Sequence, residues 1–388
     1  MQSWFSILGR ERELAMAELA AVAEPSTPLE QHGAITVGGG DMPSWERVGS
    51  IQRAGTILGT CTSLDAADII ALLDGLPTSG KIQLGISVLG LKKNEYQRLA
   101  MQLKTALKEH GNSARIITGT DSSVLNAAQL IHNQLISSNG IELVIWEHHH
   151  TWWLGRTTWV QDIEAYTRRD RDRPARDARV GMLPPKLAQT LINLAQPDKN
   201  DMIYDPFCGT GVVLMEAALM GYKVGGSDLS ERMVEASKQN MHWLQSIAPV
   251  SGNPEIMAQD ARSASIPTKP GSRVCIVGEG YLGLPLGPEA TRDEARAQIQ
   301  ELDRLYIDVL QNLSQQANIR TIVLALPFWH IQGQEYRLKF LDSLDRIGYT
   351  FHQFAPRATD WLTYRRDDQR VGRMIVRLVK KSEAKKEL

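Results

Sequence analysis

Short apolar or alternating segments predict strands in the first part of the chain, and runs rich in Ala, Leu, Met and Glu predict helices. The predicted strands cover residues 3–8, 81–88, 115–117, 141–146 and 151–158. The predicted helices cover residues 11–22, 63–73, 95–109 and 126–135. Such a mixture, up to about residue 160, indicates one or two small α+β units.

Strands and helices alternate more regularly from about residue 200 onward. Strands are predicted at residues 202–204, 224–227, 274–277, 321–326 and 374–378. Helices are predicted at residues 186–194, 213–220, 232–243, 290–311 and 338–347. This alternation is typical of an open α/β sheet of the Rossmann-like type. An arginine-rich segment, residues 162–179, with interleaved acids, separates the two regions, and Pro184 and Pro185 begin the next helix.

Composition describes an ordinary protein with room for more than one domain. The 388 residues suffice for two or three domains that each bury a core. A net charge of −1 argues against nucleic-acid binding by bulk charge, although it leaves room for a local basic face. The three cysteines show no C-x-x-C spacing, so we expect neither a zinc ribbon nor a disulfide framework. No stretch has the length of a membrane span, and we predict a cytoplasmic protein.

The most informative local pattern is the segment DPFCGTG, residues 205–211, between a short apolar strand and a helix. Gly209 and Gly211 carry no side chain, so backbone N–H groups can approach a ligand. The third glycine of a dinucleotide fingerprint would fall at Leu214, which argues against NAD. An acid before the glycines, Asp205, suits the sulfonium and amino groups of S-adenosylmethionine, although an N-cap is the structural alternative. The segment therefore predicts a methyltransferase, with Phe207 among the cofactor contacts.

Two further acids lie where neighbouring strands are predicted to end. Asp228 closes the second strand of the α/β region, where a carboxylate can bind both ribose hydroxyls of a nucleoside. Asp260 would end a third strand and could bind the adenine amino group. The structural alternatives are a helix N-cap for Asp228 and a solvated turn for Asp260. We predict both as cofactor contacts.

Four segments together resemble one family. They are FSILGRERELAMAEL, RDRPARDARVGMLPPKLAQTLINLA, DPFCGTG and YRRDDQRVGRMIVRL, which begin at residues 5, 171, 205 and 364. They are similar to the THUMP-domain tRNA methyltransferases, which methylate the N2 amino group of guanosine at position ten of tRNA. The resemblance implies a ferredoxin-like plus THUMP region that binds tRNA at residues 1–160, a linker at 161–185 and a Rossmann-like methyltransferase domain at 186–380. By position it implies cofactor contacts at Asp205, Gly209, Gly211, Asp228 and Asp260.

The chain departs from this family at the catalytic motif. The family has Asp or Asn, then Pro-Pro, then Tyr or Phe, at the end of the fourth strand. There a polar side chain and a backbone carbonyl accept hydrogens from the target amino group, and the aromatic ring stacks on the flipped base. Here the strand runs into Gly278-Glu279-Gly280-Tyr281. If Tyr281 is the aromatic residue, Gly278 takes the place of the acid and Glu279 is the nearest acceptor, displaced by one residue.

This departure leaves three alternatives. Glu279 substitutes for the missing acid, methyl transfer proceeds through positioning alone, or the protein binds RNA without turnover. The intact cofactor segment favours an active enzyme, and we predict Glu279 and Tyr281 as its catalytic residues. A DNA amino-methyltransferase is a further alternative, but a THUMP-like region has no obvious use on DNA and argues against it.

Other candidate sites have plain structural alternatives. The arginine-rich linker could follow a phosphate backbone or form a solvated, self-paired helix. A basic set near the C-terminus, interrupted by Trp361 and Tyr364, could face RNA: Arg357, Arg365, Arg366, Arg370 and Arg373. His148, His149 and His150 cannot all face one site from a strand, so we predict no metal. Phe328 and Trp329 could stack on a base, although core packing is the stronger prediction.

Overall fold

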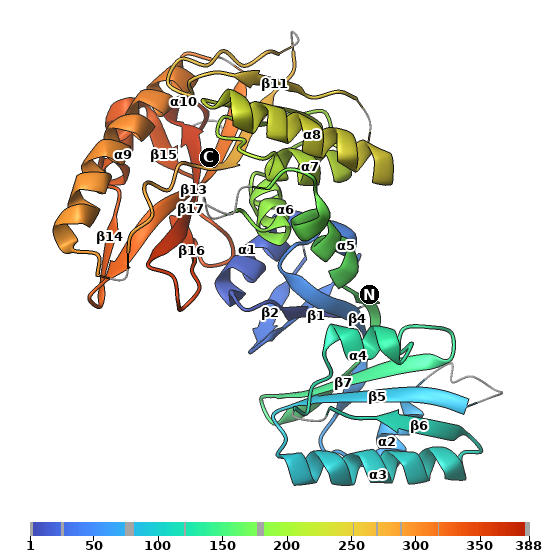
Figure 1. Ribbon diagram of the computed structural model, residues 1–388. Coiled ribbons are helices and arrows are strands. Elements are labelled where there is room, and N and C mark those ends of the chain that lie inside the picture. The colour runs from blue at the N-terminus through green and yellow to red at the C-terminus, as the bar shows by residue number, and fades with distance from the viewer. Residues whose placement is uncertain are drawn as a thin grey trace. The chain divides into compact units, whose positions relative to one another are not determined.

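The computed structural model describes residues 3–24, 27–73, 81–119, 122–176, 182–250, 252–268, 271–287, 289–316 and 318–384. The chain forms two compact units (Figure 1). The first comprises Met1–Arg12, Ala23–Glu46 and Ile51–Ile163, and the second comprises Glu13–Val22, Arg47–Ser50 and Glu164–Leu388. None of the helices in the described ranges is long and apolar enough to cross a membrane.

The first unit is built on one mixed sheet of eight strands in the order β2-β3-β1-β4-β8-β7-β5-β6. Its strands are β1 (Ser3–Leu8), β2 (Leu29–His32), β3 (Ile35–Gly39), β4 (Ile51–Cys61), β5 (Lys81–Leu89), β6 (Ser113–Ile117), β7 (Gly140–His148) and β8 (Thr151–Val160). Strand β5 runs parallel to β6 and β7. Helix α3 (Lys93–Glu109) buries one face at helical spacing, with Tyr96, Leu99, Leu103 and Leu107. These side chains belong to a hydrophobic cluster that also contains residues of α2 (Ala66–Ala71) and β5. Helix α4 (Ala127–His132) precedes β7.

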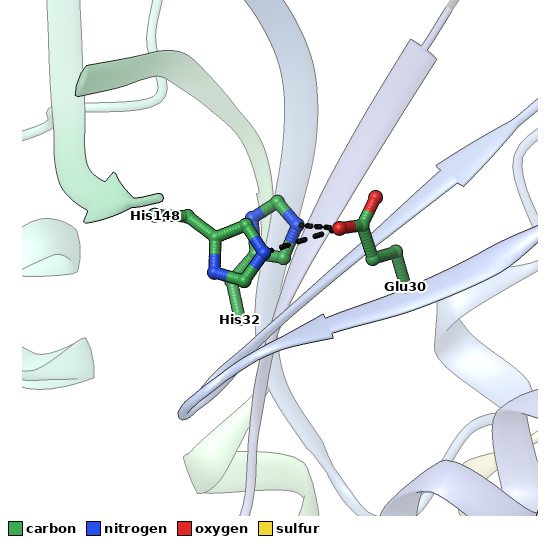
Figure 2. A group of neighbouring side chains, drawn as sticks. All are labelled: Glu30, His32 and His148. Atoms are coloured by element: carbon green, nitrogen blue, oxygen red, sulfur yellow. Dashed lines mark hydrogen bonds and ion pairs between the residues drawn. The ribbon is translucent and has the colours of Figure 1, made fainter. Parts of the chain in front are cut away.

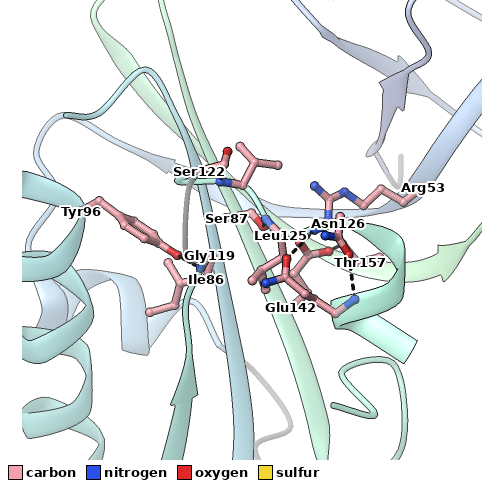
Figure 3. A network of polar contacts seen from close by, with 12 residues as sticks. Arg53, Ile86, Ser87, Tyr96, Gly119, Ser122, Leu125, Asn126, Glu142 and Thr157 are labelled. Carbon is pink, nitrogen blue, oxygen red and sulfur yellow. Dashed lines mark hydrogen bonds and ion pairs between the residues drawn. The ribbon is translucent and has the colours of Figure 1, made fainter. Parts of the chain in front are cut away.

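A polar network crosses four neighbouring strands of this sheet (Figure 3). Glu142 of β7 is fully buried, and its carboxylate accepts hydrogen bonds from Arg53 Nη1 at 2.5 Å, Ser87 Oγ at 2.6 Å and Thr157 Oγ1 at 2.5 Å. These partners lie on β4, β5 and β8, so the network joins β4-β8-β7-β5. Because the charge is paired and its oxygens are bonded, the network fixes this part of the sheet without an unpaired buried charge.

The second unit contains a nine-stranded sheet in the order β11-β10-β9-β12-β13-β17-β15, with β14 on β13 and β16 on β17. The strands are β9 (Met202–Asp205), β10 (Lys223–Asp228), β11 (Glu255–Ala258), β12 (Val274–Glu279), β13 (Ile319–Ile331), β14 (Gln334–Arg337), β15 (Tyr349–Phe351), β16 (Trp361–Tyr364) and β17 (Val371–Lys380). From β11 to β13 all neighbours are parallel, whereas β17 runs antiparallel to β13. This is the predicted Rossmann-like architecture.

Helices cover both faces of the second sheet. One hydrophobic cluster joins α1 (Arg12–Val22), α6 (Pro185–Leu194) and α7 (Val212–Leu219) to the sheet, and α8 (Glu231–Ile247) packs against α7. A separate cluster packs α9 (Arg292–Ser314) and the 3₁₀ helix η3 (Phe340–Ile347) against the sheet through Tyr306, Ile322 and Val376. The parallel strands therefore end between helices from both layers, and ligands of open α/β sheets bind at such carboxyl ends.

The predicted elements are confirmed with small changes of boundary, and two predictions need correction. Residues 338–347, predicted as an α-helix, form the 3₁₀ helix η3, which has a non-helical residue at Ser343. The predicted strand at 321–326 is part of the longer β13. Short strands at the sheet edges and the long β4 were not predicted. Gly55 in β4 explains part of that failure, because a Cβ there would lie 1.9 Å from the Arg156 carbonyl oxygen on β8.

A buried carboxylate on α1 ties the early segments of the second unit to α6. Glu18 is fully buried, and its Oε1 accepts hydrogen bonds from the Gly49 N–H at 2.9 Å and Asn193 Nδ2 at 2.7 Å. Its Oε2 accepts from the Ser50 N–H at 2.8 Å, the Ser50 hydroxyl and Thr190 Oγ1 at 3.1 Å. One side chain thus satisfies donors from two separate segments, residues 49–50 and α6.

Replacement of Glu18 by Gln should loosen α1, because an amide donor would then face N–H and O–H donors. We expect a loss of roughly 1–3 kcal/mol in the free energy of unfolding, measured by urea denaturation, and faster amide exchange in α1. The exposed Glu24→Gln variant is the matched control and should behave as wild type. Equal exchange of α1 in all three proteins would show that Glu18 does not hold this helix.

Candidate active site

A cavity of about 530 Å³ opens at the carboxyl ends of β9, β10 and β12. Its size lies within the range of small-molecule sites. Each of the site residues predicted from the sequence, apart from Gly211, lines it; these are Asp205, Phe207, Gly209, Asp228, Asp260, Glu279 and Tyr281. Segments far apart in the sequence therefore meet around one space.

The cofactor segment forms a tight turn between β9 and α7. The Cys208 N–H donates to the Ser227 carbonyl at 2.9 Å, and the Gly211 N–H donates to the Cys208 carbonyl at 2.7 Å. Gly209 and Gly211 have φ angles of +51° and +83°, which favour glycine. At Gly211 a Cβ would also lie 2.4 Å from Ser237 Oγ on α8. The predicted role of Gly211 as a position without a side chain is thus explained by packing against α8.

Asp228, the last residue of β10, holds this turn from the neighbouring strand. Its Oδ2 accepts a hydrogen bond from the Gly209 N–H at 2.9 Å, and its Oδ1 accepts one from the Ser230 N–H at 2.9 Å. A carboxylate has about four lone-pair sites, so both oxygens retain capacity for ribose hydroxyls. The second bond fixes the turn that leads into α8, whose N-cap is Ser230, so the structural alternative of a helix N-cap does not apply to Asp228.

Asp205 lines the cavity from an almost fully buried position beneath the turn. Asp205 is 3% exposed, and its Oδ1 accepts a hydrogen bond from the Phe207 N–H at 2.9 Å. Burial raises the pKa of this carboxyl well above its ordinary value, and the nearby Asp228 and Glu279 charges add to that. A Cβ on Gly278 would lie 2.3 Å from Asp205 Oδ1. The carboxyl group of Asp205 therefore occupies the space that any side chain at position 278 would need.

Glu279 is the last residue of β12, and its side chain is 15% exposed and lines the cavity. The Arg373 Nε donates a hydrogen bond to Glu279 Oε1 and forms an ion pair with it. Burial raises the pKa of Glu279 above its ordinary value, and the Arg373 guanidinium partly offsets this. The site therefore contains a carboxylate with one paired oxygen and an edge on the cavity.

The loop after Glu279 is fixed by backbone contacts, while its aromatic side chain stays accessible. The Gly280 N–H donates to the Ala325 carbonyl at 3.1 Å, and Tyr306 Oη donates to the Tyr281 carbonyl at 2.8 Å. A Cβ on Gly280 would lie 2.2 Å from Tyr306 Oη. Tyr281 itself is 40% exposed at the cavity. A rigid backbone thus presents an aromatic ring that a planar group could stack on.

Asp260 lies just after β11 at the edge of the cavity, and its carboxylate is already engaged. Its Oδ2 accepts from Arg262 Nη2 at 2.6 Å, and its Oδ1 accepts from the Arg262 N–H at 2.9 Å. These bonds lower the pKa of Asp260, so it stays ionised as an acceptor. Asp260 thus forms the turn that was its structural alternative and also lines the cavity, and its contact with the cofactor stays a prediction.

The arginine-rich linker is neither wholly solvated nor a continuous basic face over its described part. Arg169 Nε donates to the buried Glu216 on α7 at 2.6 Å, and Arg173 is 2% exposed. Asn240 on α8 bonds both the N–H and the carbonyl of Ala175, and also the Thr210 carbonyl of the cofactor turn. The linker is therefore anchored to the cofactor turn. Residues 177–181, with Arg179, lie outside the described residues.

Arg373 was predicted in a basic set at the surface, whereas the structure places it beside Glu279. One signal was present in the sequence: Arg373 falls inside the apolar strand segment VGRMIVRL, where an arginine implies a buried partner. Phe328 and Trp329 are 3% and 0% exposed, so the core-packing alternative is confirmed for both.

His148 is brought together with two residues of β2 in the first unit (Figure 2). Glu30 Oε1 lies 3.1 Å from the Nε2 atoms of both His32 and His148, whose rings stack with centroids 3.6 Å apart. Trp146 Nε1–H donates to His32 Nδ1 at 3.0 Å. Because an indole only donates, a neutral His32 carries its proton on Nε2, and that nitrogen has no lone pair for a metal. His149 and His150 follow in a turn with positive φ.

Comparisons with known proteins relate this site to methyltransferases. Residues 173–263 match the family model described as "RMKL-like, methyltransferase domain". The tRNA (guanine(10)-N2)-dimethyltransferase of Pyrococcus abyssi is 30% identical over 250 residues, which cover 62% of this chain and 67% of that protein. The chain belongs to this family. The predicted class, an S-adenosylmethionine-dependent methyltransferase, is thereby confirmed.

Two further comparisons place this family member among known sequences and folds. A protein of the same name from Methanothermobacter thermautotrophicus is 49% identical over 61 residues, 16% of this chain and 18% of that protein. The crystal structure of TrmN from Thermus thermophilus aligns with 98% of this chain and 100% of its own, with a TM-score of 0.51 and 15% identity. That structural likeness concerns the fold.

Replacement of Gly278 by Ala in this methyltransferase should displace the Asp205 carboxylate and with it the cofactor turn. We expect the affinity for S-adenosylhomocysteine, measured by isothermal titration calorimetry, to fall about tenfold or more, since each 1.4 kcal/mol of strain costs a factor of ten. Gly287→Ala is the matched control, because a Cβ there meets nothing within 4 Å. Equal affinities for both variants and wild type would contradict the close packing of Asp205 against Gly278.

Proposed function

We propose that this protein transfers a methyl group from S-adenosylmethionine to the exocyclic N2 amino group of guanosine at position ten of tRNA. The observation that carries the proposal is that Glu279 and Tyr281 line the same cavity as the cofactor turn. A carboxylate and an exposed aromatic ring at that place suit a planar base that carries an amino group. Membership of the tRNA (guanine(10)-N2)-dimethyltransferase family supports the choice of guanosine and of tRNA.

The residues around the turn fit the methyl donor. Gly209 leaves its surroundings open, because a Cβ there meets only the Phe207 carbonyl oxygen at 3.9 Å. Asp228 offers carboxylate lone pairs for the ribose hydroxyls. Asp260 lies at the edge of the cavity, where both its oxygens already accept hydrogen bonds from Arg262, so a bond to the adenine amino group would replace one of these. Asp205 supports the methionine end from beneath the turn through its bond to the Phe207 N–H. S-adenosylmethionine supplies an electrophilic methyl group when it is bound here.

Glu279 takes the role of the acid that the family motif carries one position earlier. Its unpaired edge would accept a hydrogen from the guanine amino group and so direct the nitrogen lone pair toward the methyl carbon. Tyr281 would stack on the flipped base, because its ring is exposed while its backbone is fixed by Tyr306. In this proposal, glycine at position 278 makes room for the Asp205 carboxyl group, and its presence does not by itself mean a loss of activity.

The first unit would bind the tRNA and present it to the second. The resemblance to the family supports this assignment, with a ferredoxin-like plus THUMP region expected within residues 1–160, a linker at 161–185 and the methyltransferase domain at 186–380. A tRNA substrate supports a cytoplasmic location. Binding without turnover, or methylation of a DNA amino group, are the outcomes that would replace this proposal.

The direct test is methylation of an unmodified tRNA transcript with labelled S-adenosylmethionine, followed by nucleoside mass spectrometry. We expect N2-methylated guanosine at position ten, because the cavity pairs a methyl donor site with an acceptor for an amino group. A transcript with adenosine at position ten is the control and should remain unlabelled. Cofactor binding without any methylated nucleoside would favour the RNA-binding alternative, and label only in DNA would favour the other.

Replacement of Tyr281 by Ala should weaken methyl transfer through loss of base stacking. Stacking of a base on an aromatic ring contributes about 1–3 kcal/mol, which corresponds to a decrease of roughly 5- to 150-fold in kcat/KM for tRNA. Tyr281→Phe keeps the ring and should stay near wild type. Because the side chain is exposed, affinity for S-adenosylhomocysteine should change little in either variant. Equal kcat/KM for Ala and Phe would remove Tyr281 from the base site.

A further inference from the structure

Arg373 is a buried cation at the edge of the proposed acceptor site. It is 5% exposed on β17, its Nε donates to Glu279 Oε1, and its guanidinium lies 5.9 Å from the centre of the Tyr364 ring. Most ion pairs of surface arginines contribute little, because water screens them. This pair differs, since both side chains are largely buried and the carboxylate partner lines the cavity.

The register of the sheet brings the two side chains together. Glu279 on β12 lies beside Ala325 on β13, and Arg373 on β17 lies opposite Pro327 on the same strand. Residues 325 and 327 are two apart, so their side chains project from one face of β13. Glu279 and Arg373 therefore share that face on either side of β13, and Ala325 between them is small. The pairing is built into three adjacent strands and does not depend on a mobile loop.

The ion pair controls the state of the carboxylate as well as its direction. Burial raises the pKa of Glu279, and the guanidinium opposes that effect. The bond engages Oε1 and leaves the lone pairs of Oε2 for another donor.

We propose that Arg373 is a positioning residue for methyl transfer, which holds Oε1 of Glu279 so that Oε2 meets the amino group of the acceptor base. This inference rests on the proposed function. In the step, the amino nitrogen forms a bond to the methyl carbon while the carbon–sulfur bond breaks and leaves its electron pair on sulfur. The nitrogen then releases one proton, which the Glu279 carboxylate accepts and passes to water. Arg373 touches neither the base nor the methyl group.

Arg373→Gln in the full-length protein is the first test. We expect kcat to fall roughly 10- to 100-fold, the effect of a hydrogen bond to a charged group, with KM for tRNA and for S-adenosylmethionine close to wild type. The ionised carboxylate is the active form, so loss of the cation raises the pKa of Glu279 and moves the acid limb of kcat to higher pH. Arg373→Lys should restore part of kcat, because it returns the charge without the guanidinium geometry.

The matched control is Arg346→Gln, an exposed arginine in η3, which should retain the wild-type kcat and pH profile. A variant Arg373→Gln with a lower melting temperature or weaker S-adenosylhomocysteine binding, but with wild-type kcat and acid limb, would overturn the proposal. In that case Arg373 serves folding alone.

A second measurement does not depend on turnover. The carboxyl carbon of Glu279 is followed by ¹³C NMR in glutamate-labelled protein bound to S-adenosylhomocysteine, and Glu279→Gln identifies its signal. We expect a higher titration midpoint in Arg373→Gln than in wild type. An unchanged midpoint would overturn the inference even in a fully active enzyme. Absence of tRNA methylation by the wild type, together with a shifted midpoint, would instead overturn the proposed function and with it the role in transfer, while the ion pair itself would stand.

Discussion

The Asp205 carboxyl group packs against the backbone of Gly278, and the arrangement of the whole site depends on this contact. Asp205 ends β9, and its bond to the Phe207 N–H fixes the turn of residues 205–211. Gly278 lies in β12, which ends at Glu279 and leads into Gly280 and Tyr281. A side chain at position 278 would meet Asp205 Oδ1 at 2.3 Å. The Asp205 turn and the segment of β12 that precedes Glu279 are therefore closely packed against each other.

This contact fits glycine at position 278, where the family motif carries an acid. Asp205 fills the space that a side chain at position 278 would need, and in the proposed function the acceptor comes from the next residue. Glu279 has the longer side chain that a displaced position requires, and it lines the cavity at 15% exposure. A second buried acid so close to Asp205 would favour protonation of one of the two, because like charges and burial both raise the carboxyl pKa. Arg373 provides the compensating charge.

The parts of this arrangement that are local in sequence could be predicted, and those that arise from sheet register could not. The sequence around residues 205–211 predicts the end of a strand, a glycine turn and the start of a helix. The contact of Asp228 with Gly209 follows because β9 and β10 are adjacent parallel strands. Arg373 lies 94 residues from Glu279 and reaches it only through the antiparallel pairing of β17 with β13. From the sequence alone, Arg373 was grouped with the basic residues that could face RNA, because no local pattern indicates that β17 pairs with β13. The contacts of the buried Glu18 with Gly49 and Asn193 likewise join segments far apart in the sequence, which hydrophobic periodicity does not relate to one another.

We propose that a carboxylate at position 279 accepts the hydrogen of the guanosine amino group. It is tested most directly by single-turnover methyl transfer to tRNA with the isosteric variant Glu279→Gln, with S-adenosylhomocysteine binding measured on the same preparation. The account predicts a transfer rate at least about tenfold lower than wild type, since a neutral amide is a weaker acceptor than a carboxylate, with cofactor affinity unchanged. Transfer at the wild-type rate by Glu279→Gln would contradict the account.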